Sequence, residues 1–233
     1  MAITQIQREF VKDASHKLRD LITVCRGHLE LIGDDPNHSR RTIALVMDEL
    51  DRMGRMVDGM QLLAEAEQPE FLRPELTDLE LFTHELTEKA SALAARRWML
   101  DHAADGCVVA DRHRLTEAVL ALTQNAVNHT SADDAIAIGT AMSENEWRLW
   151  VRDTGTGISD SDHERIFDHF ARGIDAHRRY PGGGLGLAIV KAIAEAHDGR
   201  VEVESRVGEG STFMIILSRN PGERLDRRLP PSG

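Results

Sequence analysis

The sequence of 233 residues predicts a mixed α + α/β fold, in which a helical hairpin precedes a two-layer α/β sandwich. The first observation is an apolar spacing of alternating three and four residues over residues 3–68, which is typical of bundled helices. The second is a change, after a linker containing Pro69 and Pro74, to strand-like and helix-like segments over residues 75–219. Long glycine-bearing connections between these segments favour a sandwich over a parallel doubly wound sheet.

Residues 1–68 are expected to form two long antiparallel helices. The stretch Gly33-Asp34-Asp35-Pro36-Asn37 between them contains a helix stop followed by turn residues. Two helices bury little apolar surface, so we expect the hairpin to pair with a second copy in a dimeric four-helix bundle. The apolar positions are Val11, Ala14, Leu18, Leu21, Cys25, His28 and Ile32, then Ile43, Val46, Leu50, Met53, Val57, Met60 and Ala64.

The second region, residues 75–219, combines both periodicities. Helices are predicted over residues 80–96, 112–128 and Leu185 to His197. Alternation or β-branching predicts strands over 106–110, 135–142, 147–153, 200–205 and 211–217. The proline-containing tail 220–233 is expected to be disordered.

Composition excludes several classes of function. A formal net charge of -11 and an aromatic content of 4% argue against nucleic-acid binding. Cys25 and Cys107 form no C-x-x-C pair, so neither a disulfide framework nor a zinc site is expected, which fits the cytoplasm. No apolar run of about 18 residues occurs, so we expect no membrane contact from this chain itself. It also fits the cytoplasmic portion of a membrane-bound protein.

Three segments of the second region carry ligand-binding chemistry. The first, "LTQNAVNHT" at 122–130, ends a predicted helix. Asn125 offers an amide oxygen, a hard ligand of the kind that Mg²⁺ prefers. The alternative interpretation is a helix end with exposed polar residues.

The second segment is "VRDTGTGI" at 151–158. A carboxylate at the end of a strand, here Asp153, can accept a hydrogen bond from an adenine amino group. Gly155 and Gly157 would let the backbone approach the ring closely. A strand end followed by a flexible turn is the alternative.

The third segment, "PGGGLGLAIV" at 181–190, is a glycine run leading into a helix. Backbone N–H groups and the helix dipole at such a start suit phosphate groups. The segment matches neither the Rossmann pattern nor the Walker A loop. Each segment alone is a weak signal, but the three together in this order are a strong one.

These motifs resemble those of the sensor histidine kinases, members of the Bergerat-type ATPase superfamily. The N-terminal hairpin is similar to the dimerisation and histidine-phosphotransfer domain of the same kinases, and the resemblance spans residues 5 to 218. The matching motifs are Asn125 with its neighbours, "DTGTGI" at 153–158, "RIFDHFARG" at 165–173, "GGGLGLAIV" at 182–190 and "GEGSTF" at 208–213.

The resemblance implies ATP and Mg²⁺ as cofactors of a Bergerat-type sandwich. It implies that Asn125 coordinates Mg²⁺, that Asn128 and His129 lie near the phosphates, and that Asp153 holds the adenine amino group. The other nucleotide-binding residues that it implies are Gly155, Gly157, Ile158, Phe170, Arg172, Gly182, Gly184, Leu185, Gly186, Leu187 and Thr212.

His16 lies in the stretch "FVKDASHKLRDLI" at 10–22. It is two residues from both Ala14 and Leu18, about 200° around the helix, so its side chain should point to solvent. A surface histidine of no special role is the general alternative. The match to the phosphoacceptor motif of the family implies that His16 is phosphorylated.

The match departs from the family pattern beside His16. The family usually has an acidic residue directly after the histidine, where this chain has Lys17, and Asp20 and Leu21 replace the usual Thr or Asn and Pro. An acid there accepts the Nδ1 proton and makes Nε2 more nucleophilic. Asp20, at i+4, and Asp13, at i−3, are the candidates to replace it.

The function expected from the resemblance is therefore histidine autophosphorylation at His16, followed by transfer to an aspartate of a response-regulator receiver domain. The expected partners are a second copy of the chain and that receiver domain. The alternative is a non-catalytic, ATP-binding dimeric scaffold that regulates its partner by binding.

Overall fold

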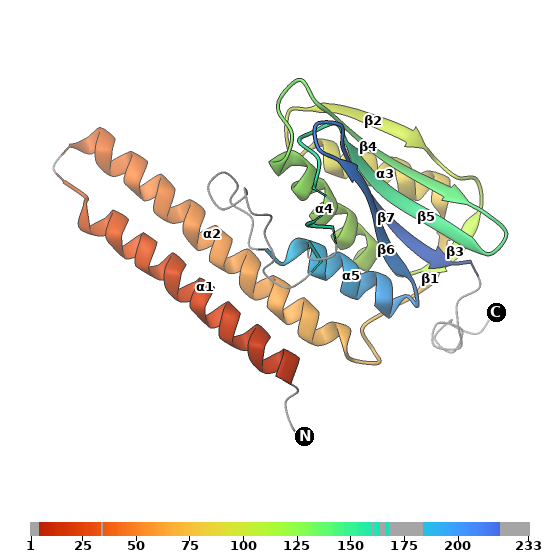
Figure 1. Ribbon diagram of the computed structural model, residues 1–233, viewed down its shortest axis with the longest axis horizontal. Coiled ribbons are helices and arrows are strands. Elements are labelled where there is room, and N and C mark those ends of the chain that lie inside the picture. The colour runs from red at the N-terminus through yellow and green to blue at the C-terminus, as the bar shows by residue number, and fades with distance from the viewer. Residues whose placement is uncertain (1–4, 34, 160, 164–165, 168–183, 220–233) are drawn as a thin grey trace. The chain divides into compact units, whose positions relative to one another are not determined.

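The structure is a computed structural model that describes residues 5–33, 35–159, 161–163, 166–167 and 184–219 (Figure 1). The chain divides into two compact units, Met1–Gln61 and Leu62–Gly233. The predicted tail 220–233 lies outside the described residues.

The first unit is an antiparallel helical hairpin, as the sequence predicts (Figure 1). Helix α1 spans Gln5–Glu30, and α2 begins at Pro36 and extends to Ala66. The turn between them is held by two local hydrogen bonds. The Asn37 N–H donates to Asp35 Oδ1 at 3.0 Å, and the Ser39 hydroxyl donates to the Gly33 carbonyl at 2.9 Å.

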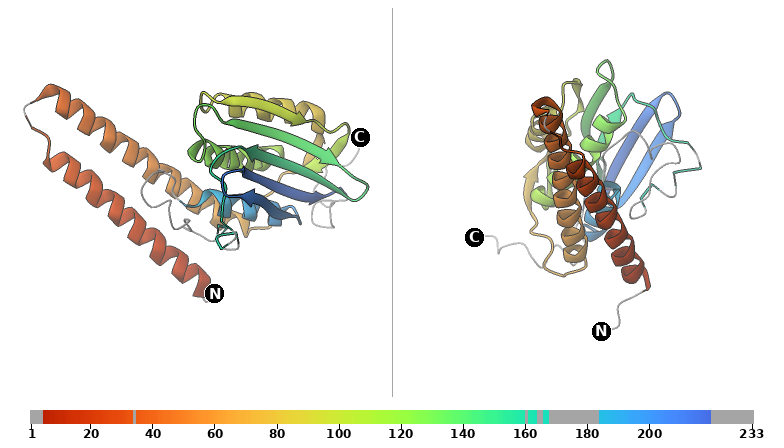
Figure 2. Two further views of the ribbon diagram at one scale, coloured as in Figure 1. Left: turned by 45° about the horizontal axis from the view of Figure 1, so that its top comes forward. Right: turned by 90° about the vertical axis from the view of Figure 1, so that its left-hand side faces the viewer.

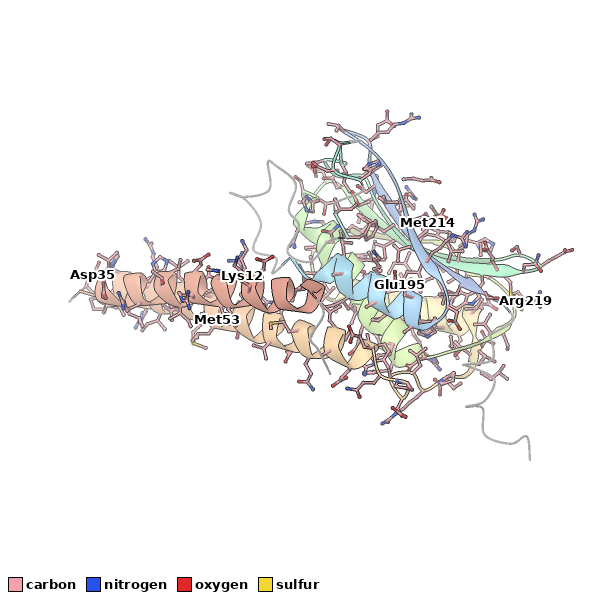
Figure 3. All side chains as sticks on the ribbon, turned by 60° about the horizontal axis from the view of Figure 1, so that its bottom comes forward. Lys12, Asp35, Met53, Glu195, Met214 and Arg219 are labelled. Carbon is pink, nitrogen blue, oxygen red and sulfur yellow. The ribbon has the colours of Figure 1, made fainter. Side chains whose placement is uncertain are left out.

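The hairpin buries only some of the apolar residues of its predicted seam. Side chains project from all sides of α1 and α2 (Figure 3). Ala14, Cys25 and Val46 of the predicted seam are buried. Three other seam residues remain half exposed at a spacing of seven residues: Ile43 at 51%, Leu50 at 47% and Val57 at 50%. A single hairpin therefore covers only part of the predicted stripe.

The second unit contains two sheets, of which Figure 2 shows the larger. The larger has the order β2-β4-β5-β7-β6, in which β2 and β4 are parallel and the other pairs are antiparallel. Its strands are β2 (Arg97–His102), β4 (Ala135–Met142), β5 (Glu146–Asp153), β6 (Arg200–Arg206) and β7 (Gly210–Ser218). A small antiparallel sheet pairs β1 (Glu75–Asp78) with β3 (Cys107–Ala110).

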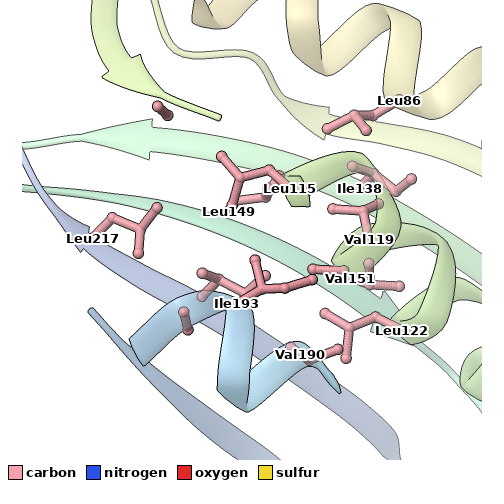
Figure 4. Packing of buried hydrophobic residues seen from close by; sticks show 14 of the residues in the cluster. Leu86, Leu115, Val119, Leu122, Ile138, Leu149, Val151, Val190, Ile193 and Leu217 are labelled. Carbon is pink, nitrogen blue, oxygen red and sulfur yellow. The ribbon is translucent and has the colours of Figure 1, made fainter. Parts of the chain in front are cut away.

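Three helices and one face of the large sheet enclose the core (Figure 4). These helices are α3 (Leu79–Ser91), α4 (Arg112–Asn128) and α5 (Gly186–Ala196). Strand β5 shows how the sequence builds this layer, because Trp147, Leu149 and Val151 are buried at alternate positions. Leu115 of α4 and Ile193 of α5 belong to the same cluster. The two-layer sandwich expected from the sequence is confirmed.

Strands β1 and β2 were missing from the prediction, and both begin at charged residues, Glu75 and Arg97. The helix predicted over 80–96 ends at Ser91, and β2 starts at Arg97. The indole N–H of Trp98 closes the turn before β2 by donating to the Ala94 carbonyl at 2.9 Å. On the outer face, Asp101 accepts hydrogen bonds from Arg152 Nε at 2.9 Å and Trp150 Nε1 at 3.2 Å. This pairing, distant in sequence, fixes the edge strand.

The last turn of α2 and the linker after it belong to the second unit. Leu62 and Ala66 pack against its core, and Phe71 and Leu72 are each only 6% exposed. Arg114 of α4 joins them. Its guanidinium pairs with Glu65 at 3.1 Å and lies 4.2 Å from the centre of the Phe71 ring. The units therefore divide at Gln61/Leu62, ahead of the boundary at residue 68 that the sequence suggests.

Asp111 is the polar junction beneath this linker. Its carboxylate caps α4 by accepting the Arg114 N–H at 3.0 Å, and it accepts the Arg73 N–H at 2.7 Å. Its own N–H donates to Nε2 of His197, whose Nδ1 lies 2.7 Å from the Ile193 carbonyl. These partners require the neutral imidazole with its proton on Nδ1, and burial lowers the pKa of His197 accordingly. Linker, α4 and α5 thus meet at one network.

Asp198 offers a test of how α5 ends. It is exposed and has a φ of 57°, a left-handed conformation that glycine adopts without strain. Its charge also lies at the negative end of the helix dipole. We expect Asp198→Gly to raise the free energy of unfolding by about 1 kcal/mol in urea denaturation. Asp198→Ala removes the same charge but keeps a Cβ, so equal gains in both variants would contradict the backbone explanation.

Candidate functional site

The C-terminal end of α4 brings the first motif to one edge of the sandwich. The helix starts at its Asp111 cap and ends at His129, whose N–H donates to the carbonyls of Asn125 and Ala126 at 3.2 and 3.1 Å. Asn125 and His129 are half-buried. Burial lowers the pKa of His129, which favours the neutral form of its ring. Asn128 accepts a hydrogen bond from Gln124 Nε2 at 3.2 Å.

Asp153 ends β5 and is only 5% exposed. Its Oδ1 accepts the Gly155 N–H at 2.8 Å, and the Ser211 backbone also donates to the carboxylate. Burial raises the pKa of Asp153 to about 6, with a smaller contribution from the charge of Asp134, and the two N–H donors only partly oppose this shift. A carboxylate kept in such surroundings is typical of a functional site.

Two glycines allow the backbone to close around Asp153. A Cβ on Gly155 would collide with the His129 carbonyl, and one on Gly157, which has a φ of 68°, would collide with the Arg206 carbonyl. Thr156 between them donates its N–H to the His129 carbonyl at 3.2 Å and accepts the Gly208 N–H at 2.8 Å. The loop therefore joins the end of α4 to the turn before β7.

The start of α5 supplies backbone N–H groups. Gly184 has a φ of 74°, and Leu185 is the buried N-cap residue, whose apolar side chain cannot accept a hydrogen bond. The first N–H groups of a helix have no partner within it, so they remain available to an anion. Gly186 lies beside α4, since a Cβ there would be 4.0 Å from that of Ala121, and Leu187 packs on the core.

The strand register distinguishes Ser211 from Thr212 at the last motif. Asp153 pairs with Ser211, whereas Thr212 pairs with Arg152 and therefore lies on the opposite face of the sheet. The structure thus brings Ser211, and not the predicted Thr212, to Asp153. Ser205 is a further residue that the sequence did not suggest. Its hydroxyl accepts the Ile158 N–H at 2.8 Å and lies 2.9 Å from the Ser211 hydroxyl.

The remaining predicted residues fall elsewhere. Phe170, Arg172 and Gly182 lie outside the described residues. His16, Asp13 and Asp20 belong to the hairpin, where all three are exposed, in agreement with the helical geometry expected for His16.

The end of α4 offers one oxygen ligand of the kind that a hard cation accepts, the half-buried amide of Asn125. Across the described part of the chain, no cluster of three or more His, Cys, Asp or Glu side chains could hold a metal ion. If a Mg²⁺ ion were held at the end of α4, the neutral amide of Asn125 would supply one oxygen ligand, and water would supply several of the others.

Comparison with known proteins agrees with this arrangement. Residues 6–69 match the family model of the His Kinase A (phospho-acceptor) domain. Residues 110–221 match that of the histidine kinase-, DNA gyrase B- and HSP90-like ATPases. The sensor protein SrrB of Staphylococcus aureus is 30% identical over 228 residues, which cover 93% of this chain and 39% of SrrB.

Two solved structures share the fold. The Acinetobacter baumannii histidine kinase AdeS is 24% identical with a TM-score of 0.67, over 88% of this chain and 98% of that one. The histidine kinase ThkA, in complex with the response regulator protein TrrA, is 23% identical with a TM-score of 0.72, over 92% and 62%.

The order of a phosphoacceptor hairpin and a Bergerat-type ATPase domain defines a class of signalling protein. The chain belongs to the sensor histidine kinases of two-component systems. It spans less than half the length of the curated relatives it matches. None of the helices in the described residues is long and apolar enough to cross a membrane.

The raised pKa of Asp153 predicts a pH-dependent stability. The carboxyl titrates near its ordinary value of 3.8 when unfolded and at about 6 when folded, so the folded state binds the extra proton between these values. The stabilisation is fully present below about pH 4 and is lost as the pH rises through about 6. Asp153→Asn should therefore raise the free energy of unfolding by about 1–3 kcal/mol at pH 8. The gain should vanish at pH 4, and an equal gain at both pH values in urea denaturation would contradict the assignment.

Proposed function

We propose that this protein is an ATP-dependent histidine autokinase that transfers the γ-phosphoryl group to His16 and then to an aspartate of a response regulator. The observation that carries the proposal is the buried Asp153 carboxylate, enclosed by the loop with Gly155 and Gly157, by Gly210 and by the end of α4. Such a site matches an adenine ring, which offers an amino donor and a flat face for close backbone approach.

The nucleotide roles follow from this placement. Asp153 accepts a hydrogen bond from the adenine amino group, while Gly155 and Gly157 keep the backbone close to the ring. The N-terminal N–H groups of α5 face the phosphates, with Asn128 and His129 near them. Asn125 holds Mg²⁺, which when bound neutralises phosphate charge. Gly182, Gly184, Leu185, Gly186 and Leu187 with Ile158, Phe170 and Arg172 complete the proposed site, and Ser211 takes the position first expected for Thr212.

His16 is the proposed nucleophile because its side chain is exposed on α1. The neutral Nε2 lone pair attacks the γ-phosphorus, a P–N bond forms, and the bond from phosphorus to the bridging oxygen breaks to release ADP. Asp20 or Asp13 accepts a hydrogen bond from Nδ1–H and stabilises the positive charge that develops on the ring. An aspartate carboxylate of the receiver domain then takes the phosphoryl group. The complex of ThkA with TrrA supports a partner of this kind.

Lys17 favours a second candidate function. A cation at the position of the usual acid disfavours an imidazolium next to it, and the nucleotide pocket needs no phosphotransfer to bind ATP. The second candidate is therefore an ATP-binding dimeric scaffold that regulates its partner by binding.

Incubation with γ-labelled ATP and Mg²⁺ decides between these functions. Label should appear slowly on the wild-type chain and be absent from His16→Ala. Because a positioned general base typically contributes about 10²–10⁴-fold, Lys17→Glu should raise the rate by a sizeable part of that factor. Asp20→Asn should lower the rate if Asp20 orients the ring, and Asp13→Asn tests the other candidate.

His38→Ala is the matched control, because His38 is also an exposed histidine of the hairpin. It should label like the wild-type chain. Label that persists in His16→Ala would contradict His16 as the phosphorylated residue, and absence of label even in Lys17→Glu would favour the scaffold.

The dimer is proposed to form through the uncovered apolar stripe of the hairpin. Ile43, Leu50 and Val57 recur every seven residues, the repeat that a helix buries against a second helix. Leu50→Glu should therefore shift sedimentation from dimer to monomer at micromolar concentration. A fragment of residues 62–219 should be monomeric. A wild-type monomer, or a dimeric fragment, would place the interface elsewhere.

A further inference from the structure

Arg96 lies immediately before β2, outside the motifs that mark the nucleotide pocket, yet its guanidinium reaches the end of α4. Its Nη2 donates to the Thr130 carbonyl at 3.1 Å and the Val127 carbonyl at 3.4 Å. Its Nε donates to the Thr130 hydroxyl at 3.1 Å. Its Nη1 donates to the Ala95 carbonyl at 3.0 Å, which fixes the plane of the group. One side chain thus holds the residues that end the helix.

The end of a helix needs such a partner because its last carbonyl groups have no N–H donor within the helix. Thr130 satisfies part of this need, since its hydroxyl donates to the Ala126 carbonyl at 2.8 Å. The planar guanidinium of Arg96 offers several donors in a fixed geometry, and its positive charge lies at the negative end of the helix dipole. Lysine could supply the charge but not the fork of donors.

This helix end carries the residues proposed to face Mg²⁺ and the phosphates. Asn125, Asn128 and His129 all lie within its last turn, and the His129 carbonyl accepts the Thr156 N–H of the glycine loop at 3.2 Å. The residue after Arg96 is tied to the same region, because the Arg97 N–H donates to the Asp134 carbonyl at 3.4 Å. The start of β2 therefore fixes where the end of α4 lies.

We propose that Arg96 is a positioning residue for the Mg²⁺ and phosphate side of the nucleotide pocket. It acts through the end of α4 and not by touching the nucleotide. The adenine side, which Asp153 defines at the end of β5, receives none of the hydrogen bonds that Arg96 donates, so it should change less than the Mg²⁺ side. This inference rests on the proposed function.

The test compares the affinity of the non-hydrolysable ATP analogue AMP-PNP with Mg²⁺ and with EDTA, measured by calorimetry on the full chain. The ratio of the two affinities is the gain due to Mg²⁺. Arg96→Gln should reduce this ratio about tenfold, the lower end of what loss of a residue supporting a metal ligand typically causes. The affinity in EDTA should fall by much less than the affinity with Mg²⁺, because Arg96 donates no hydrogen bond to the adenine side.

Two further variants complete the series. Arg96→Lys should give an intermediate ratio, since it keeps the charge without the fork of donors. Arg97→Gln is the matched control, because Arg97 is the exposed neighbour of Arg96, and its ratio should be unchanged. If Arg96→Gln does not fold, Thr130→Val makes the same comparison by removing the hydroxyl to which Arg96 donates.

The outcomes separate the two proposals. An equal fall of both affinities in Arg96→Gln would show a purely structural role and overturn the inference, as would an unchanged ratio. A wild-type chain whose affinity does not depend on Mg²⁺ would overturn the proposed function and this inference with it. A wild-type gain that Arg96→Gln retains would overturn the inference alone.

Discussion

The hydrogen bond from the Thr156 N–H to the His129 carbonyl is the contact on which the nucleotide site depends. It joins the end of α4 to the loop that leaves β5, two segments that are separated by the whole of β4 and β5 in the sequence. The neighbouring glycine makes the contact sterically possible, since a side chain on Gly155 would occupy the place of that carbonyl. The polar groups around Asp153 gain their common location from this meeting of backbones.

Sequence periodicity was sufficient for the elements that bury one face. The hairpin helices, α4, α5 and the central strands carry apolar residues at regular intervals, and the structure contains each of them. The edge strand β2 was missed because it buries little of itself. Asp101 of β2 pairs with Arg152 of β5, which lies 51 residues later in the sequence. No local sequence pattern reveals such a pairing. At the linker, Pro69 and Pro74 indicate an irregular connection, but they do not show that Phe71 and Leu72 within it are buried.

The sequence predicted which residue types form the candidate site better than it predicted how their side chains are arranged. Glycines and Asp153 carry a strong pattern because a backbone that approaches a ligand tolerates few side chains. The choice between Ser211 and Thr212 depends on strand register, where a shift of one residue reverses the face. Ser205 and Arg96 carry no motif, because each acts through backbone groups of distant segments. His16 was placed correctly on an exposed face, but its chemistry depends on charges beside it that periodicity does not describe.

The docked linker has a consequence for how such chains can be recombined. Chimeric signalling proteins are made by fusing a domain of one protein to a domain of another at a domain boundary. A proline-containing linker is a common choice of fusion point. In this chain a join at Pro69 or Pro74 would leave the receiving module without Leu62 and Ala66, and the second join also without Phe71 and Leu72. The apolar surface that they cover would then be exposed to water. A transferable ATPase module therefore has to start at Leu62, inside α2. The sequence pattern alone would assign the whole of that helix to the hairpin.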